Sequence, residues 1–120
     1  MSENYCVPGA EPSRFAFPFA AVPQGARVLI YGGGIVGKTF VQEVGRTGHC
    51  QIVAMADKRP QLVKVEGIRV ICPEDIPKES FDFLLIAMER QDLAAEVWRT
   101  FRNIVVSDSK MRWIDPSRRR

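Results

Sequence analysis

The sequence predicts an α/β fold, with a doubly wound parallel sheet in a single domain. Short apolar stretches typical of buried parallel strands alternate with amphipathic stretches typical of helices. A run of glycines separates the first such strand from the first helix. Hydrophobic residues make up 46% and charged residues 26% of the 120-residue chain, which excludes wholesale disorder. Because this length holds one core, it excludes a cofactor domain paired with a separate substrate domain in this chain alone.

The expected elements follow one another from residue 27. Apolar runs predict strands, and apolar positions spaced three or four apart predict helices. We expect about five strands in the order 3-2-1-4-5, with right-handed crossovers and helices on both faces. The strands are expected at residues 28–31, 51–56, 68–71, 82–87 and 103–106, and the helices at 35–46 and 90–101, with a helical turn starting at 73–75.

The two ends of the chain are predicted to differ from the domain at residues 27–115. Residues 1–26 contain four prolines, which exclude a long helix or a central strand and favour an extended arm. The alternating Phe15, Phe17 and Phe19 would bury one edge of that arm on this domain or on a neighbouring subunit. Residues 116–120 are predicted to be a basic tail that keeps the protein soluble.

Composition also limits the setting of the protein. No apolar run approaches the roughly 20 residues that span a bilayer, so we expect no membrane span. The three cysteines, Cys6, Cys50 and Cys72, are odd in number and widely spaced, which predicts reduced thiols and neither disulfides nor a metal site. We therefore expect a cytoplasmic protein.

The glycine run carries the strongest functional signal. Gly32, Gly34 and Gly37 fit the pattern G-x-G-x-x-G directly after a strand and at the start of a helix. In a Rossmann-like fold, the first glycine permits the tight turn, the second lets the backbone approach a pyrophosphate, and the third packs the helix against the strand. The helix N-terminus then offers N–H groups to the phosphates. The residues of this run that are predicted to bind the cofactor are Gly32, Gly33, Gly34, Ile35, Val36 and Gly37.

An acid completes this pattern. Asp57 lies 20 residues beyond Gly37, at the end of the second strand, where a carboxylate can accept hydrogen bonds from both ribose hydroxyls. This favours an unphosphorylated ribose, although Lys58 and Arg59 could accept a 2′-phosphate. Met88 follows the fourth strand, at the edge where ligands of open α/β sheets bind, and is also predicted to contact the ligand. For other residues after strand ends, including Asp108 and Ser109, helix capping is favoured over ligand contact.

The glycine run also fits a second motif. Residues 32–39 also match the P-loop pattern G-x-x-x-x-G-K-[ST], with Lys38 for phosphates and Thr39 for Mg²⁺. The chain is short for that fold, and no aspartate that could anchor the metal follows the fourth strand. A P-loop NTPase is therefore the least favoured enzyme hypothesis.

No catalytic constellation is visible in the sequence. Neither tyrosine is followed by a lysine four residues later, and the single histidine, His49, is expected at the end of the first helix that faces away from the ligand. No nucleophile paired with a base can be identified. We therefore expect a binding domain more than a complete enzyme, and assign no catalytic residue.

Residues 27–106 resemble a known group of domains. The segments RVLIYGGGIVGKTF, IVAMADKRP and GIRVICPEDIPKESFDFLLIAM are similar to small Rossmann-type nucleotide-binding domains of bacterial surface-polysaccharide biosynthesis. These include the N-terminal domains of PglD-type acyltransferases and the CapD-like and FkbM-associated domains. The resemblance implies an accessory module that binds a nucleotide or nucleotide sugar through Gly32, Gly34, Gly37 and Asp57. Neither the acyltransferase repeats nor a dehydratase domain follows, so no enzymatic activity is transferred.

These observations lead to one main hypothesis and three alternatives. The main one is a domain that binds NAD or a nucleotide sugar in glycan biosynthesis and works as a homo-oligomer or with a partner catalytic domain. The first alternative is a fragment of an NAD(P)-dependent oxidoreductase that needs a partner. The others are the P-loop NTPase and an interaction module without a ligand. Nucleic acid is not expected as a partner.

Overall fold

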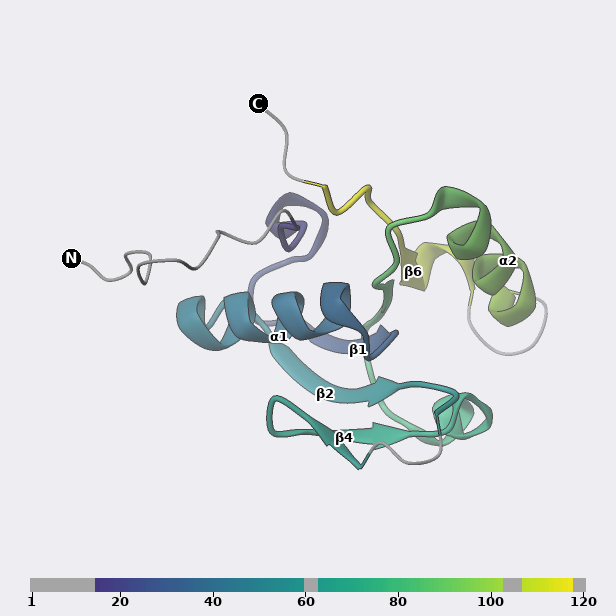
Figure 1. Cartoon of the computed structure of the whole chain (residues 1–120), viewed down its shortest axis with the longest axis horizontal. Coiled ribbons are helices and arrows are strands. Elements are labelled where there is room, and N and C mark those ends of the chain that lie inside the picture. The colour runs from purple at the N-terminus through teal and green to yellow at the C-terminus, as the bar shows by residue number, and fades with distance from the viewer. Residues whose placement is uncertain (1–14, 60–62, 103–106, 118–120) are drawn as a thin grey trace.

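A computed structural model describes residues 15–59, 63–102 and 107–117 of the chain. These residues form a six-stranded sheet with the order β3-β4-β2-β1-β5-β6 (Figure 1). Two α-helices and three 3₁₀ turns complete the described part. The strands are β1 (Arg27–Tyr31), β2 (Gln51–Ala56), β3 (Lys64–Val65), β4 (Ile68–Ile71), β5 (Phe83–Ile86) and β6 (Met111–Arg112); the helices are α1 (Ile35–Thr47) and α2 (Gln91–Arg102); the 3₁₀ turns are η1 (Phe19–Ala21), η2 (Pro73–Lys78) and η3 (Asp108–Lys110).

The central four strands confirm the predicted fold class and order. Strands β4, β2, β1 and β5 are parallel neighbours and correspond to the predicted strands 3, 2, 1 and 4. The predicted fifth strand, at residues 103–106, lies outside the described residues. Among those that are described, β6 holds the place next to β5. Strand β3 was not predicted from the sequence. It pairs antiparallel with β4 through a turn at Glu66 and Gly67, both with positive φ.

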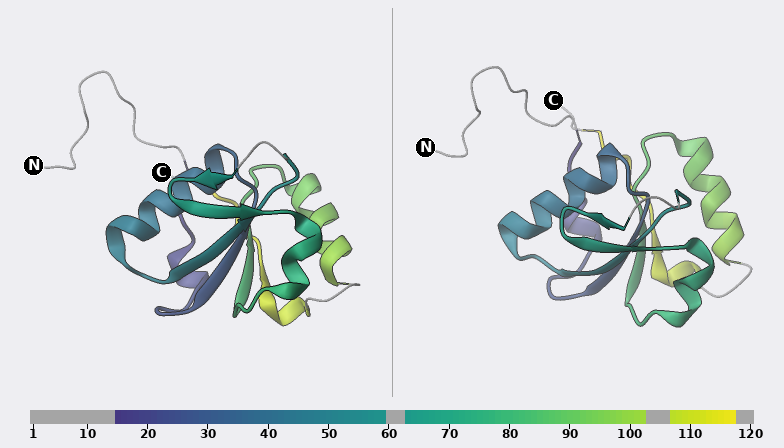
Figure 2. Two further views of the ribbon diagram at one scale, coloured as in Figure 1. Left: turned by 90° about the horizontal axis from the view of Figure 1, so that it is seen from below. Right: turned by 60° about the horizontal axis from the view of Figure 1, so that its bottom comes forward.

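Apolar residues on both faces of the sheet explain why its strands read as continuous apolar runs. Val28 and Ile30 point into one core cluster with α1, whereas Leu29 and Tyr31 point into a second cluster. That second cluster contains the α2 residue Phe101 together with residues of η2 and β6. Figure 2 shows α1 and α2 on opposite sides of the sheet. The doubly wound arrangement predicted from the sequence is therefore confirmed.

The segment before β1 packs against α1. Phe15 and Phe17 are buried, and the rings of Phe17 and Phe40 meet edge to face with their centroids 5.4 Å apart. The N–H of Phe17 donates to the buried Glu43 carboxylate at 2.7 Å. Phe19 is only partly buried and starts the 3₁₀ turn η1, so this part of the predicted arm is not uniformly extended. The alternation of the aromatic rings thus reflects burial on this same domain.

The two ends of the described chain meet beside α1. The N–H of Ala16 donates to the carbonyl of Pro116 at 2.7 Å, and Phe15 forms an antiparallel bridge with Ser117. Pro116, the first residue of the predicted basic tail, is fully buried. In the described residues, no helix combines the length and the apolar character needed to cross a membrane.

Candidate functional site

A pocket lies at the carboxyl ends of three parallel strands. Strand β1 has β2 on one side and β5 on the other, and the helices that follow β1 and β5 cover opposite faces of the sheet. This divergence is the topological switch point where open α/β sheets bind ligands. The pocket has a volume of about 260 Å³. Its lining residues are Tyr31, Gly32, Asp57, Lys58, Met88, Leu93, Glu96 and Val97.

The glycine run at residues 32–37 requires glycine at its first and last positions. Gly32 has a φ of +115°, and a Cβ atom there would lie 2.8 Å from the carbonyl oxygen of Ala87. Gly37 lies in the first turn of α1, where a Cβ atom would overlap the carbonyl oxygen of Gly32. Both contacts are with backbone atoms, which cannot rotate away. The first and third glycines therefore let β1, α1 and β5 approach one another closely.

The middle of the turn is open. A Cβ atom at Gly34 would meet no atom within 4 Å, and Gly34 is exposed. Gly34 is also the N-cap of α1, and no side chain caps the first N–H groups of this helix. The first turn carries no acidic residue either. A helix start of this kind combines uncapped donors with a positive dipole end, which suits an anion such as a phosphate.

Asp57 faces this turn from the end of β2. The N–H of Gly33 donates to Oδ2 of Asp57 at 2.6 Å. Arg59 donates to Oδ1 through its backbone N–H and its Nε, both at 2.9 Å, and to Oδ2 through Nη2 at 3.0 Å. These bonds, with that of the Arg59 side chain foremost, lower the pKa of Asp57 to about 2. The carboxylate is therefore ionised at neutral pH.

The structure brings together some of the predicted site residues and separates others. Gly32, Asp57, Lys58 and Met88 line the pocket, and Gly33 reaches it through its hydrogen bond to Asp57. The remaining members of the glycine run lie outside the lining. Gly34 and Ile35 are exposed at the start of α1, Val36 is buried in the core cluster under α1, and Gly37 contacts Gly32.

Four residues that line the pocket were not predicted from the sequence. Tyr31 ends β1, and burial together with Asp57 raises the pKa of its hydroxyl. Leu93, Glu96 and Val97 lie on α2, where Leu93 and Val97 are four residues apart and share one face. Such spacing is typical of the side of a helix that faces the core, but Leu93 remains 41% exposed. One signal could have identified this part of the site. Leu93 is an apolar residue in the first turn of α2, and α2 follows β5, one of the strands at the switch point.

Other candidate residues have structural partners. Thr39 donates its hydroxyl to the carbonyl of Ile35 within α1, and Lys38 is exposed on the same helix, so the contacts do not favour a P-loop.

His49 bonds the carbonyl of Val22 through Nε2 at 2.6 Å, after the C-terminal end of α1. Asp108 accepts a hydrogen bond from Trp98 at 2.8 Å and does not line the pocket. No group of three or more potential metal ligands occurs within the described ranges.

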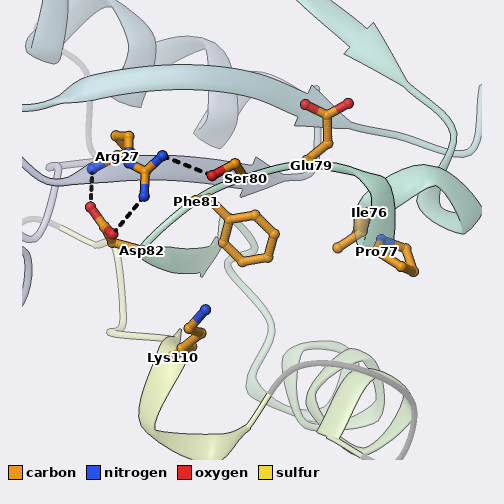
Figure 3. Close-up of a pocket in the computed structure, with 8 residues that line it drawn as sticks. All are labelled: Arg27, Ile76, Pro77, Glu79, Ser80, Phe81, Asp82 and Lys110. Atoms are coloured by element: carbon orange, nitrogen blue, oxygen red, sulfur yellow. Dashed lines mark hydrogen bonds and ion pairs between the residues drawn. The ribbon is translucent and has the colours of Figure 1, made fainter.

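A larger pocket of about 410 Å³ lies at the opposite edge of the sheet (Figure 3). There the Arg27 guanidinium donates to the Ser80 hydroxyl and to the Asp82 carboxylate, at the amino ends of β1 and β5. The amino edge of an open α/β sheet is not where its ligands bind. We therefore assign the candidate site to the smaller pocket. The lining of the larger one consists of Arg27, Ile76, Pro77, Glu79, Ser80, Phe81, Asp82 and Lys110.

Three solved structures of RSP, a Rex-family repressor, share the fold. The repressor on its own is 14% identical to this chain, with a TM-score of 0.56 over 76% of this chain and 53% of that chain. Its complex with β-NADH gives 14% identity and a TM-score of 0.54 over 75% and 53%. Its complex with β-NAD⁺ and operator DNA gives 15% and 0.54 over 75% and 50%. At this identity the likeness establishes the fold alone.

The matches also show how much of each solved structure this chain covers. It spans about half the length of the solved structures it matches. The comparison with curated proteins found no match. One protein-family model, described as C2185-like, N-terminal, matches residues 24–111 of the 120, which includes the glycine turn, Asp57 and both helices. The chain therefore belongs to the C2185-like, N-terminal family.

Proposed function

We propose that this chain is an NAD(H)-binding domain that lacks a complete catalytic site of its own. One observation carries the proposal: the ionised carboxylate of Asp57 is held by the N–H of Gly33, so an acid and an uncapped glycine turn share one crevice at the switch point. A dinucleotide offers both of the groups that such a crevice suits, a pyrophosphate and a ribose diol.

Each part of the ligand has a proposed set of contacts. The pyrophosphate would bind at Gly34 and the first N–H groups of α1, because no side chain competes for them. The adenosine ribose would bind at Asp57. Lys58 and Met88 line the same pocket, and Lys58 supplies a positive charge close to the anionic ligand. Ile35, which is 68% exposed beside the turn, would be covered by the bound ligand.

We favour NAD over other nucleotides because of the proteins that share this fold. RSP, whose fold this chain shares, has been solved with β-NADH and with β-NAD⁺. The nucleotide sugar and the role in glycan biosynthesis expected from the resemblance gain no support from these comparisons. A nucleotide sugar therefore serves as the competing ligand in the test below. The expectation that nucleic acid is no partner is likewise unsupported, because one RSP complex contains operator DNA.

The size of the pocket supports the need for a second surface. Small-molecule sites usually occupy about 300–1,000 Å³. This pocket holds about 260 Å³ and is open to solvent. We propose that the part of the dinucleotide beyond it is covered by another copy of the chain or by a partner catalytic domain. Hydride transfer would then need groups from that partner.

Titration with NADH tests the proposal. We expect NADH to bind and Asp57→Asn to raise its Kd by about tenfold or more, because the amide keeps an acceptor for Gly33 but loses the charge-assisted bonds to ribose. Asp82→Asn is the matched control: this aspartate also forms an ion pair with an arginine, but at the opposite edge of the sheet, and its loss is expected to leave Kd unchanged.

Parallel titrations separate the alternatives. Binding of UDP-sugars without binding of NADH would overturn the proposed ligand and favour the nucleotide-sugar hypothesis. Mg²⁺-dependent ATP binding that Lys38→Ala abolishes would favour the P-loop hypothesis. If no nucleotide binds or shifts the melting temperature, the chain is an interaction module and the proposed function is wrong.

A further inference from the structure

The carboxylate that is proposed to hold the ribose already has a full set of hydrogen bonds. A carboxylate offers about four acceptor positions. Asp57 uses four: Oδ1 accepts from the backbone N–H and the Nε of Arg59, and Oδ2 accepts from Gly33 N and from Nη2 of Arg59. Three of these four donors belong to one residue, Arg59. A ribose diol therefore has to replace at least one bond from that residue.

The guanidinium of Arg59 lies on the solvent side of this carboxylate. The Asp57 side chain is 10% exposed, whereas that of Arg59 is 47% exposed. Nη2 of Arg59 also lies 3.4 Å from the position that a Cβ atom of Gly33 would take, so the cation covers part of the glycine turn. A ligand that approaches the turn from solvent meets Arg59 before it meets Asp57.

We propose that Arg59 is a specificity-determining residue that competes with the ribose diol for Asp57 and offers its guanidinium to a 2′-phosphate. This inference rests on the proposed dinucleotide function. Binding of NADH has to open the Asp57–Arg59 ion pair, which weakens NADH binding. The displaced guanidinium stays near the ribose because the backbone of Arg59 remains bonded to Oδ1. An acid at this position usually excludes NADPH because it repels the 2′-phosphate, and the nearby guanidinium of Arg59 reduces that repulsion.

Two substitutions separate this competition from a simple effect of charge. Arg59→Ala and Lys58→Ala each remove one positive charge from neighbouring residues. NADH and NADPH are both anionic, so the loss of charge alone weakens the binding of both. Only Arg59 is bonded to Asp57, whereas Lys58 lines the pocket. The two variants are therefore expected to change NADH affinity in opposite directions.

Fluorescence titration of wild type and variants with NADH and with NADPH measures the effect. For Arg59→Ala we expect the Kd for NADH to fall about two- to fivefold, which is the range that opening one partly exposed ion pair allows. The Kd for NADPH is expected to rise. Lys58→Ala is expected to raise both. Arg59→Lys keeps the charge but cannot bond both oxygens in parallel, so NADH is expected to bind more tightly than to wild type.

The outcomes distinguish this inference from the proposed function. If wild type binds NADH and Arg59→Ala leaves its Kd unchanged or raises it, Arg59 is no competitor and the inference fails while the function stands. If neither wild type nor any variant binds NADH, both fail. A cooperative thermal melt shows that Arg59→Ala is folded. Because Arg59 is about half exposed, loss of its ion pair is expected to lower the melting temperature by only a few degrees.

Discussion

At the scale of single residues, the site depends on glycines, which have no Cβ atom. Gly32 and Gly37 leave out Cβ atoms that would collide with backbone carbonyls, whereas Gly34 leaves a surface open. The same motif therefore contains two kinds of glycine, two needed for packing and one suited to a ligand. Asp57 adds the charge, and its hydrogen bond to Gly33 ties the end of β2 to the turn after β1.

The packing role of Gly37 can be tested by Gly37→Ala. We expect the free energy of unfolding to fall by about 3 kcal/mol, because the new methyl group collides with a carbonyl that cannot move. Gly45→Ala is the control in the same helix, where a Cβ atom meets nothing within 4 Å. It is expected to raise the free energy of unfolding by about 0.5–1 kcal/mol through helix propensity. Urea denaturation measures both, and equal effects would contradict the assignment.

The acid–base behaviour of Asp57 makes a second prediction. Its pKa is lowered from 3.8 to about 2 in the folded protein. A lowered pKa stabilises the folded state at pH values above the unfolded pKa, and this contribution is lost as the pH falls through the folded pKa. We expect Asp57→Asn to lose less stability than wild type between about pH 4 and pH 2. Urea midpoints at pH 5 and pH 2.5 test this, and an identical loss in both proteins would disprove it.

At the scale of elements, α1 has two partners. Its inner face packs against β1 and β2, and the segment at residues 15–26 packs along it as well. The buried carboxylate of Glu43 accepts the N–H of Phe17, and the Phe17 ring lies against Phe40. This segment therefore completes the core on the α1 side of the sheet, and α1 in turn positions the glycine turn.

Truncation of one aromatic ring tests this arrangement. Phe17→Ala is expected to lower the free energy of unfolding by about 3–5 kcal/mol, as for other buried phenylalanines. Phe17 is 3% exposed, whereas Phe19 is only partly buried. Phe19→Ala is therefore expected to cost clearly less. Thermal or urea unfolding measures both variants, and a Phe17→Ala variant as stable as wild type would show that the segment does not contribute to the core.

At the scale of the whole molecule, the sheet order creates the site. β1 lies between β2 and β5, and the following helices turn to opposite faces, so the carboxyl end of β1 is the point where the two halves of the fold diverge. The glycine turn, Asp57 and Met88 come from three separate strand ends and meet there. Helix α2 adds Leu93, Glu96 and Val97 to the lining of the same pocket.

Much of this arrangement could be predicted from the sequence because it depends on local patterns. The apolar runs predict the parallel strands, and the glycine spacing predicts the turn. Asp57 directly follows the apolar run at residues 51–56, so its place at the end of β2 could also be predicted. The pairing of Arg59 with Asp57 is different, because two residues of separation fix their distance but not which way the guanidinium turns. The same holds for Leu93 and Val97, whose spacing alone does not separate a core face from a pocket wall.

The sequence by itself determined the fold class, the parallel order of the four central strands and the residues of the glycine turn. The elements and the turn follow from periodicity and spacing over a few residues, and the strand order follows from the right-handed crossovers that connect parallel strands. Only the tertiary structure decided that β3 and β6 form the described edges, that Pro116 is buried, and that Asp57 is shared between Gly33 and Arg59. These features depend on contacts between distant segments and on side-chain orientations, which are selected by how the whole core packs.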